Sequence, residues 1–375
     1  MFNKKRGKAF LTMLLLMASL GLAACSQNRE AEADTTTEAA QSEVESETTA
    51  EQAQSETESA TKAEETDSAE EPSEEADDTL IRVGSLKGPT TIGLVNMMQE
   101  SEDGELPLNT EFTMATTADE ITAKMVSGDM DIALIPANLA SVLYNKTEGA
   151  VSVIDINTLG VLYGVTGDES VNSLEDLKGK TVYMTGQGST PEFALNYILE
   201  ENGLSGEVNI EFKNEATEIA ALLNADPTGT AILPQPFATV CLKQNEGLRE
   251  FLDLNEEWDK CASSGDSQLL TGVTVVRNDF LNENADTVAA FTAEHAASVN
   301  KASEDPKGTA ELIVKYGIIE KAPIAEAALP KCNIACITGD EMKAALSGYL
   351  EVLYNANPAS VGGELPGDDF YAVVE

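Results

Sequence analysis

Three turns of the sequence could bind a small ligand through backbone amides at a helix start. They are Lys87-Gly88-Pro89-Thr90-Thr91, Gly186-Gln187-Gly188-Ser189-Thr190-Pro191 and Pro234-Gln235-Pro236. Each places a proline near the first position of an expected helix, where the amides of the first turn have no intrahelical partner. Those amides favour a ligand anion by about 0.3–1 kcal/mol per helix. One such turn is also typical of an ordinary helix start, but three in one chain predict a binding cleft.

The segments around these turns alternate between short apolar strands and amphipathic helices, which is typical of α/β folds. We expect strands at 80–84, 109–114, 131–135, 151–154, 159–165, 180–184, 208–212, 230–233 and 269–276. Three later helices, expected at 285–303, 307–316 and 339–355, should pack on the first part of the fold. In open α/β sheets ligands bind beyond the carboxyl ends of the strands, which is where the three turns lie.

The series of strands and helices starts twice, and this predicts two lobes. The second series follows the polar stretch 168–172. We therefore assign residues 79–166 and 270–375 to lobe 1 and residues 167–269 to lobe 2. The crossings between the lobes are expected near 163–168 and 268–272. A folded part of this length can build two cores.

The first 24 residues have the features of an export signal. Basic residues within 4–8 precede an apolar run at 10–18, which is too short for a comfortable membrane span. The run leads to Leu22-Ala23-Ala24-Cys25, which resembles the lipobox of bacterial lipoproteins. We expect removal of signal peptide 1–24 and acylation of Cys25, which would anchor the protein at the cell surface, on the outer face of the cytoplasmic membrane. An ordinary secretory signal with an incidental Cys25 is the alternative.

The stretch 25–78 combines this cysteine with an acidic segment. Residues 26–78 contain 19 acidic and 2 basic residues, no aromatic residue, and Val44 as the one β-branched aliphatic residue. Such a segment cannot bury enough apolar surface to offset its chain entropy. We expect a disordered tether that is extended by its own charge. A tail that sequesters calcium or binds a partner is the alternative.

The charge and the motifs of the chain exclude several function classes. The chain has 65 acidic and 23 basic residues, a formal net charge of −42, and nucleic-acid binding would need a basic footprint. Gly186-x-Gly188 lacks the third glycine of a dinucleotide fingerprint, and Gly179-Lys180-Thr181 lacks the first glycine of a phosphate-binding loop. The single histidine, His295, lies in an alanine-rich helical stretch far from the three turns and is expected to be a helix-surface or core residue. We expect no enzyme activity, no cofactor and no metal site.

Four cysteines remain once Cys25 is acylated, and they permit three pairings. We favour the two short closures, Cys241–Cys261 and Cys332–Cys336, because the chain is expected to be exported. A metal site at Cys332-x-x-x-Cys336 is the alternative, but the motif has no histidine partner nearby in the sequence.

Three segments carry a resemblance to a known family. They are 81–90 (IRVGSLKGPT), 131–138 (DIALIPAN) and 174–182 (LEDLKGKTV). Together with the lipobox and the tether they resemble the substrate-binding lipoprotein of a bacterial ABC importer. Within that class the chain is similar to the family that binds nitrate, aliphatic sulfonates, taurine and thiamine-pyrimidine precursors. The resemblance covers about residues 80–355.

The resemblance implies a periplasmic-binding-protein-like fold of type II, with two α/β lobes joined by a two-strand hinge. It implies a monomer that encloses a small molecule between its lobes and delivers it to a membrane permease, without catalysis. By position, the ligand contacts would be Lys87, Gly88, Pro89, Thr90, Asn138 and Thr158 of lobe 1 and Gly188, Ser189, Thr190 and Gln235 of lobe 2. No cofactor is implied.

Two questions stay open at this level. The turns contain no arginine, so Lys87 is the one cation that they offer, and a small anion such as a sulfonate fits as well as a neutral heterocycle stacked on Tyr163 or Phe237. A surface lipoprotein that senses a ligand or adheres, with no dedicated transporter, is the alternative function. Relatives of this fold include a eukaryotic enzyme of thiamine-pyrimidine synthesis that consumes its own active-site histidine, but His295 lies outside the turns.

Overall fold

The computed structural model describes residues 79–261 and 267–374. The signal peptide 1–24, the acylated Cys25 and the acidic tether 25–78 are expectations that lie outside these residues. None of the helices that the structure describes combines the length and the apolar character needed to cross a membrane.

The first of two sheets has the strand order β11-β4-β10-β3-β1-β2. Its members are β1 (Ile81–Leu86), β2 (Thr110–Ala115), β3 (Ile132–Pro136), β4 (Val151–Leu159), β10 (Leu270–Arg277) and β11 (Ile334–Ile337). β1, β2 and β3 are parallel, whereas β10 runs antiparallel to β3 and β4. The expected strand 131–135 is observed as β3, and its residues 132–135 are fully buried because β3 lies between β1 and β10 in a covered sheet.

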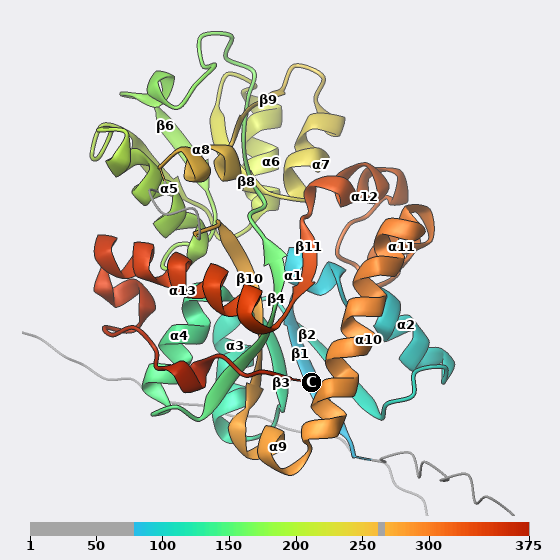
Figure 1. Cartoon of the computed structure of the whole chain (residues 1–375). Coiled ribbons are helices and arrows are strands. Elements are labelled where there is room, and N and C mark those ends of the chain that lie inside the picture. Colours follow the sequence, from blue (N-terminus) through green and yellow to red (C-terminus); the bar gives the residue numbers. More distant parts are fainter. Residues whose placement is uncertain (1–78, 262–266, 375) are drawn as a thin grey trace, which may run out of the picture. The chain divides into compact units, whose positions relative to one another are not determined.

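The second sheet has the order β7-β6-β8-β5-β9. Its members are β5 (Leu162–Thr166), β6 (Thr181–Met184), β7 (Asn209–Phe212), β8 (Thr230–Pro234) and β9 (Arg249–Asp253). β6 is parallel to β7 and β8, and β5 pairs antiparallel with β8 and β9. The two sheets, each with its own helices, occupy the lower and upper halves of Figure 1. The α/β class with two lobes is therefore confirmed.

The first lobe boundary needs a correction. Residues 162–166 were assigned to lobe 1, but they form β5 in the centre of the second sheet. The crossing therefore lies at Gly160–Val161, directly after β4. Sequence alone gave no sign of it because 151–159 and 162–166 are equally apolar and the partner β9 was not expected. The return to the first sheet at Leu270 lies within the expected region.

Helices cover both sheets. Lobe 1 carries α1 (Pro89–Ile92), α2 (Val95–Asp103), α3 (Ala118–Ser127), α4 (Ala137–Lys146), α9 (Asn278–Glu283), α10 (Ala285–Glu304), α11 (Pro306–Lys315), α12 (Ala322–Ala328) and α13 (Gly339–Ala356). Lobe 2 carries α5 (Thr190–Glu201), α6 (Ala216–Ala225), α7 (Phe237–Gln244) and α8 (Leu254–Cys261). The three late helices expected from the sequence correspond to α10, α11 and α13. The left-handed Gly128 ends α3, because glycine adopts that conformation without steric cost.

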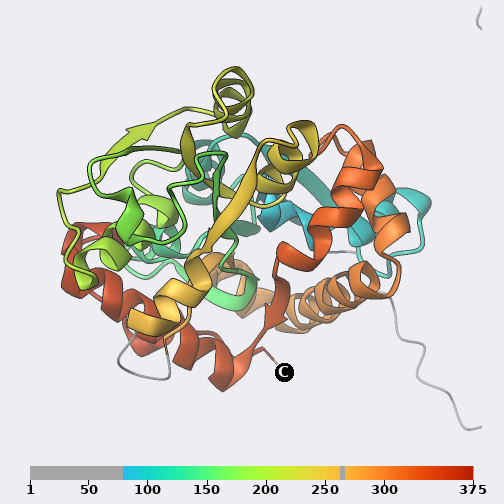
Figure 2. The ribbon, with the colours of Figure 1, turned by 90° about the horizontal axis from the view of Figure 1, so that it is seen from above.

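The C-terminal helix α13 packs against both lobes. Its Tyr349 is fully buried, with its ring 5.5 Å from that of Trp258 in α8, and its hydroxyl donates to Thr190 Oγ1 at 3.1 Å. Seen from above in Figure 2, α8 and α13 lie side by side. One apolar core runs from lobe 1 through Tyr349 into lobe 2. The lobes are thus held together by packing as well as by the two crossings.

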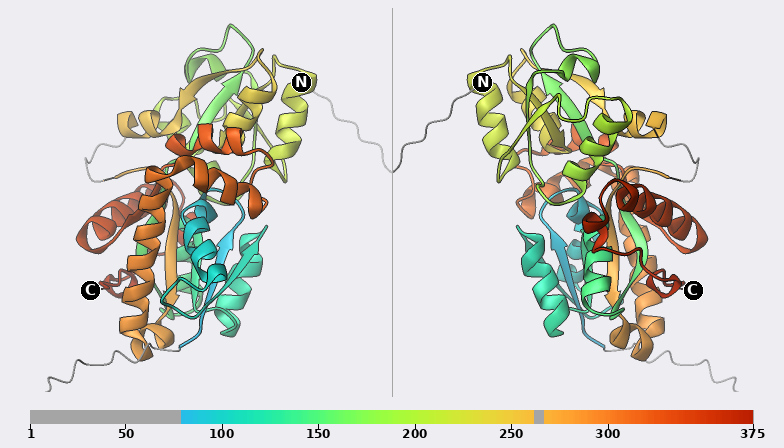
Figure 3. Two further views of the ribbon diagram at one scale, coloured as in Figure 1. Left: turned by 90° about the vertical axis from the view of Figure 1, so that its right-hand side faces the viewer. Right: turned by 90° about the vertical axis from the view of Figure 1, so that its left-hand side faces the viewer.

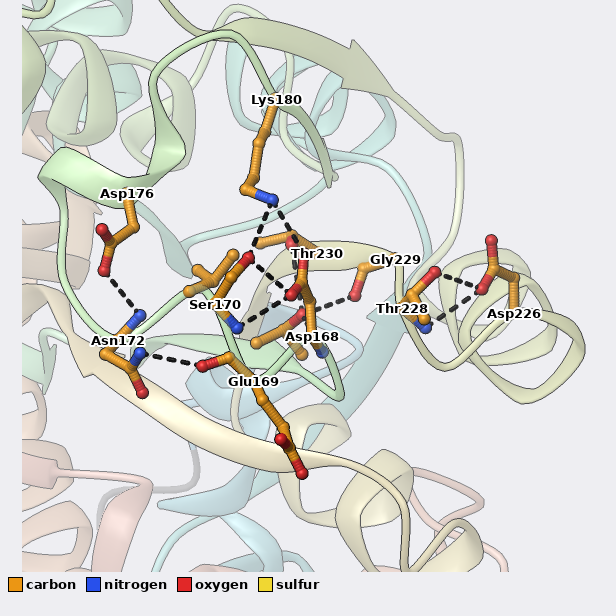
Figure 4. Close-up of polar contacts among 12 residues, drawn as sticks. Asp168, Glu169, Ser170, Asn172, Asp176, Lys180, Asp226, Thr228, Gly229 and Thr230 are labelled. Atoms are coloured by element: carbon orange, nitrogen blue, oxygen red, sulfur yellow. Dashed lines mark hydrogen bonds and ion pairs between the residues drawn. The ribbon is translucent and has the colours of Figure 1, made fainter.

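A polar network orders the turn between β5 and β6. Lys180 Nζ donates to Asp168 Oδ2 at 2.7 Å, and Ser170 donates to the other carboxylate oxygen from its backbone amide and its hydroxyl (Figure 4). These contacts, Lys180 first among them, lower the pKa of Asp168 from its usual value. Lys180 therefore orders a turn, in agreement with the rejection of Gly179-Lys180-Thr181 as a phosphate-binding motif.

Asp168→Asn should lower the thermal midpoint of unfolding at pH 7. The difference in midpoint between the variant and the wild type should become smaller as the pH falls. A carboxylate whose pKa is lowered in the folded state stabilises the fold fully above its unfolded pKa of about 3.9. That contribution is lost as the pH falls through the folded value. Thermal unfolding of both proteins at pH 7 and between pH 4 and 2 measures this difference in midpoint. A difference that is the same at pH 2 as at pH 7 would contradict the role of Asp168.

The expected disulfides are wrong, because Cys241, Cys261, Cys332 and Cys336 are all free. Cys241 is buried in the lobe 2 core, whereas Cys261 at the end of α8 accepts a hydrogen bond from Asn202 Nδ2 at 3.3 Å. Cys332 donates to Ala328 O, and Cys336 to Thr292 O. Burial raises the pKa of Cys241 to about 11 and that of Cys332 to about 12, so both are protonated thiols at neutral pH.

Candidate ligand-binding site

A cavity of about 650 Å³ lies between the lobes. Its lobe 1 wall consists of Lys87, Pro89, Thr116, Gly317, Ile318, Ile319, Glu320, Lys321 and Ile324. Its lobe 2 wall consists of Thr185, Asn214, Glu215, Ala216, Thr217, Ala220, Ala221, Asn224, Pro234, Phe237, Val240 and Gln244. The volume is within the range of small-molecule sites.

The strand ends of both sheets position the polar part of the wall. Lys87 follows β1, Thr116 follows β2 and Thr185 follows β6, each by one residue. Pro234 is the last residue of β8, and Asn214 comes two residues after β7. Since β1 and β2 are parallel to each other, and so are β6, β7 and β8, their carboxyl ends meet at this place. This is the expected location of a ligand in an open α/β sheet.

The apolar part of the wall comes from helices and one loop. Phe237 and Val240 belong to α7 and pack against the apolar cluster that contains the loop residues Ile318 and Ile319. The left view in Figure 3 shows α12, the helix that contains Ile324, next to lobe 2. An apolar body of a ligand could therefore be enclosed by side chains from both lobes.

Four charged side chains line the cavity, two of each sign. Lys87 and Lys321 belong to lobe 1, as does Glu320, and Glu215 belongs to lobe 2. All four are exposed, and none of them takes part in the ion pairs found among the described residues. The two ammonium groups can hold a ligand anion, and the carboxylates can hold a ligand cation or amine. The site suits a small polar molecule with an apolar part.

The first predicted turn lies at the cavity. Lys87 and Pro89 line it, and Gly88 between them has a φ of 145°, a conformation that favours glycine. Thr90 is buried and donates from Oγ1 to Leu86 O at 2.9 Å, so its hydroxyl closes the turn. The structure thus brings the cation of this turn, rather than its hydroxyl, to the cavity wall.

Three predicted contacts are buried where other protein groups hold them. Thr190 Oγ1 donates to Asn138 Oδ1 at 3.3 Å, which joins the two lobes directly, and Asn138 Nδ2 donates to Ser360 O. Thr158, in β4, donates to Asn157 Oδ1 at 2.8 Å. None of the three side chains is part of the cavity wall. In this arrangement Asn138 and Thr190 stabilise the contact between the lobes.

The other two predicted turns differ in how near they come to the cavity. Gln235 is buried, and its Oε1 accepts a hydrogen bond from Thr239. Its Nε2 has no hydrogen-bond partner among the described residues. The nearby residues Pro234 and Phe237 line the cavity. At the start of α5, the Gly188 amide donates to Glu192 Oε2 at 2.6 Å.

The start of α5 is therefore occupied by a carboxylate of its own helix. Ser189 Oγ turns back to Gly186 O at 2.9 Å. A ligand anion at this helix start would have to displace Glu192, so the turn 186–191 contributes its preceding residue Thr185 to the cavity rather than its amides.

Sequence reasoning missed most of the wall. Thr116 and Thr185 follow expected strands directly, so the rule for strand ends could have identified both. The loop 317–321 and the inner face of α6 gave no such signal, because they reach the cavity only through the packing of α12 and α6. Of the two aromatic candidates, Phe237 lines the cavity, whereas Tyr163 is buried with Lys331 Nζ 5.1 Å from its ring centroid.

A family model described as menaquinone biosynthesis matches residues 81–354. Comparison with curated proteins gives no match. Among solved structures, an ABC transporter protein from Parabacteroides distasonis is 25% identical with a TM-score of 0.67, over 80% of this chain and 100% of that one.

Two further similar structures are sulfonate-binding proteins. The periplasmic aliphatic sulphonate binding protein SsuA from Escherichia coli is 13% identical with a TM-score of 0.62, over 79% of this chain and 94% of its own. A putative SsuA from Methylobacillus flagellatus is 17% identical with a TM-score of 0.59, and the match covers 79% of this chain and 92% of that one. At these identities the likeness is one of fold, and it confirms the periplasmic-binding-protein-like architecture.

Proposed function

The chain belongs to the menaquinone-biosynthesis family, and we propose that it is a solute-binding protein that encloses a small organic anion between its lobes. The observation that carries the proposal is the cavity of about 650 Å³ whose wall comes from the strand ends of both sheets. A ligand that contacts both lobes at once favours the closed arrangement by its differential affinity. The solved structures with this fold include an ABC transporter protein, a periplasmic sulphonate-binding protein and a ligand-binding component of an ABC-type import system, which supports a role in uptake.

The proposed ligand carries a carboxylate or sulfonate on a compact apolar body. Lys87 and Lys321 supply cations on one wall, and Phe237, Ile318 and Ile324 supply apolar surface. The family description makes an intermediate of menaquinone synthesis one source of such a molecule, and the fold relatives make an alkanesulfonate another. Both kinds of molecule would carry an anionic group, which the lysines can bind, on an apolar body, which the apolar side chains can contact.

The remaining parts of the proposal concern location and partners. The lipobox at Cys25 anchors the protein on the outer face of the cytoplasmic membrane, and the acidic segment 26–78 spaces the binding lobes from it. The loaded protein then delivers its ligand to an ABC permease as a monomer. Chemistry on the ligand is not part of this role.

A second candidate function is a step of menaquinone synthesis itself, which the family match favours. The two functions differ in the fate of the ligand. Native mass spectrometry of freshly purified protein identifies a bound molecule, and a thermal-shift panel of sulfonates, dicarboxylates and pyrimidines adds candidates. A ligand recovered unchanged after prolonged incubation supports binding alone, whereas a ligand converted to a product supports the enzyme. A protein that binds none of these molecules would contradict both.

Lys87→Ala should weaken the binding of an anionic ligand about 10-fold or more, because a hydrogen bond to a charged group contributes about 1.5–3 kcal/mol. Isothermal titration measures the affinity. Lys243→Ala is the matched control, since Lys243 is an exposed lysine of α7 outside the cavity wall. Equal affinities of the two variants would remove Lys87 from the site.

A further inference from the structure

A buried cluster of three side chains lies in lobe 1, outside the cavity wall. Asp155 comes from β4, His295 from α10 and Cys336 from the edge strand β11. One potential ligand atom of each lies within 4.8 Å of the other two. Asp155 and His295 are 0% exposed, and Cys336 is partly buried. No histidine lies near Cys332-x-x-x-Cys336 in the sequence, but the packing of α10 on β11 brings His295 to Cys336.

Among the described residues, Asp155 has one partner that can carry a positive charge, which is His295. Asp155 Oδ1 accepts a hydrogen bond from Thr274 Oγ1 at 2.8 Å, and Oδ2 lies 3.2 Å from His295 Nδ1. No lysine or arginine pairs with Asp155 among the described ion pairs. His295 Nδ1 is the ring nitrogen that faces Asp155, whereas Nε2 lies on the side of Gly93 and has no hydrogen-bond partner within the described part of the chain. A buried carboxylate is costly unless it is paired or bound to a metal ion.

We propose that Asp155, His295 and Cys336 bind a zinc ion. Carboxylate, imidazole and thiolate are the three ligand types that Zn²⁺ takes from proteins. Two ligands at about 2.0–2.1 Å from a tetrahedral centre lie about 3.3 Å apart, close to the 3.2 Å between Nδ1 and Oδ2. Cys336 Sγ lies within 4.8 Å of both atoms and completes the set by a side-chain movement to the Zn–S distance of about 2.3 Å. A water molecule takes the fourth position.

The surroundings suit this site. Thr274 orients the carboxylate of Asp155 by hydrogen bonding, as partners of metal ligands commonly do. Cys336 is on the edge strand of its sheet and keeps some exposure, which provides a route for the ion. His295 also packs under the α1–α2 junction, because a Cβ added to Gly93 would lie 3.3 Å from His295 Nε2. Zinc would therefore fix β4, β11 and α10 beneath the turn that carries Lys87.

The test uses the full chain without a polyhistidine tag, so that His295 is the single histidine present. After chelator treatment, titration with ZnCl₂ should give one equivalent of bound zinc by elemental analysis and a higher thermal midpoint. Titration with CoCl₂ should give a tetrahedral visible spectrum and a thiolate-to-cobalt charge-transfer band. Acidic surface residues can also hold zinc, but carboxylates alone give no such band, so its absence would overturn the proposal.

Variants locate the ion. Cys336→Ser should lose the charge-transfer band and the zinc-dependent rise in midpoint, and His295→Gln should lose the tetrahedral spectrum. Cys261→Ser is the matched control, because it removes a half-buried thiol in the other lobe and should leave both signals unchanged. If a variant fails to fold, Thr274→Val, which keeps all three ligands, should weaken zinc binding about 10-fold. Equal zinc affinity in the wild type and in Cys336→Ser would overturn the site.

Discussion

Replacing Tyr349 with alanine should lower the free energy of unfolding by about 3–5 kcal/mol. The residue is fully buried in the core that both lobes share, with its ring against Trp258 and its hydroxyl bonded to Thr190. Truncation removes the ring that joins α13 to α8 and leaves a cavity between the lobes. Urea denaturation followed by circular dichroism gives the change in free energy.

Tyr349→Phe separates packing from hydrogen bonding at this position. The variant keeps the ring and loses only the bond to Thr190, so the loss should be about 1 kcal/mol. Similar losses in the two variants would mean that the ring contributes little, and the lobes would then be joined chiefly by their two crossings.

Ala221→Trp should abolish ligand binding, with a loss of affinity of more than about 100-fold, or about 2.7 kcal/mol. Ala221 is an exposed residue of α6 on the cavity wall, so an indole there would occupy space that a ligand needs. Because no core contact is removed, the stability of the protein should stay within about 0.5 kcal/mol of the wild type. Native mass spectrometry and calorimetry with the identified ligand measure the effect.

Leu222→Trp is the matched control for that substitution. Leu222 is the next residue of α6, is 37% exposed and does not line the cavity. The indole should there leave affinity unchanged. Loss of binding in both variants would indicate a general disturbance of α6, and retention in both would place the ligand elsewhere.

Much of the fold follows from local patterns in the sequence. The apolar run 131–135 predicted the strand that is observed as β3, and the apolar periodicity of 285–303 and 339–355 predicted α10 and α13 closely. Long periodic segments are the most reliable signals of this kind. The lobe boundary failed because membership of β5 in the second sheet depends on its partners β8 and β9, which are distant in the sequence.

The sequence predicted that a cavity would lie at the strand ends, but it predicted only part of the residues that line it. The rule that ligands lie at strand ends placed Lys87 and Pro89 at the cavity. It could not foresee that Glu192 would occupy the amide of Gly188, or that Thr190 would bond to Asn138. Each of these contacts satisfies groups that the turn motif alone presents as free.

The buried cluster illustrates a different limit of the sequence. His295 was expected on a helix surface or in the core, remote from anything reactive, and the structure buries it beside Asp155 and Cys336. Asp155 and His295 are 140 positions apart in the sequence. The three residues lie on three different elements. No spacing motif can identify such a site, because only the stacking of α10 over the sheet edge assembles it.

The attachment of α13 to both lobes has a consequence for motion between them. Tyr349 of α13 lies against Trp258 of α8, so a rotation of one sheet relative to the other has to loosen this aromatic contact. Domain motions of that kind take microseconds to milliseconds. We therefore expect Tyr349→Ala to make rotation between the lobes faster as well as to lower the stability of the fold.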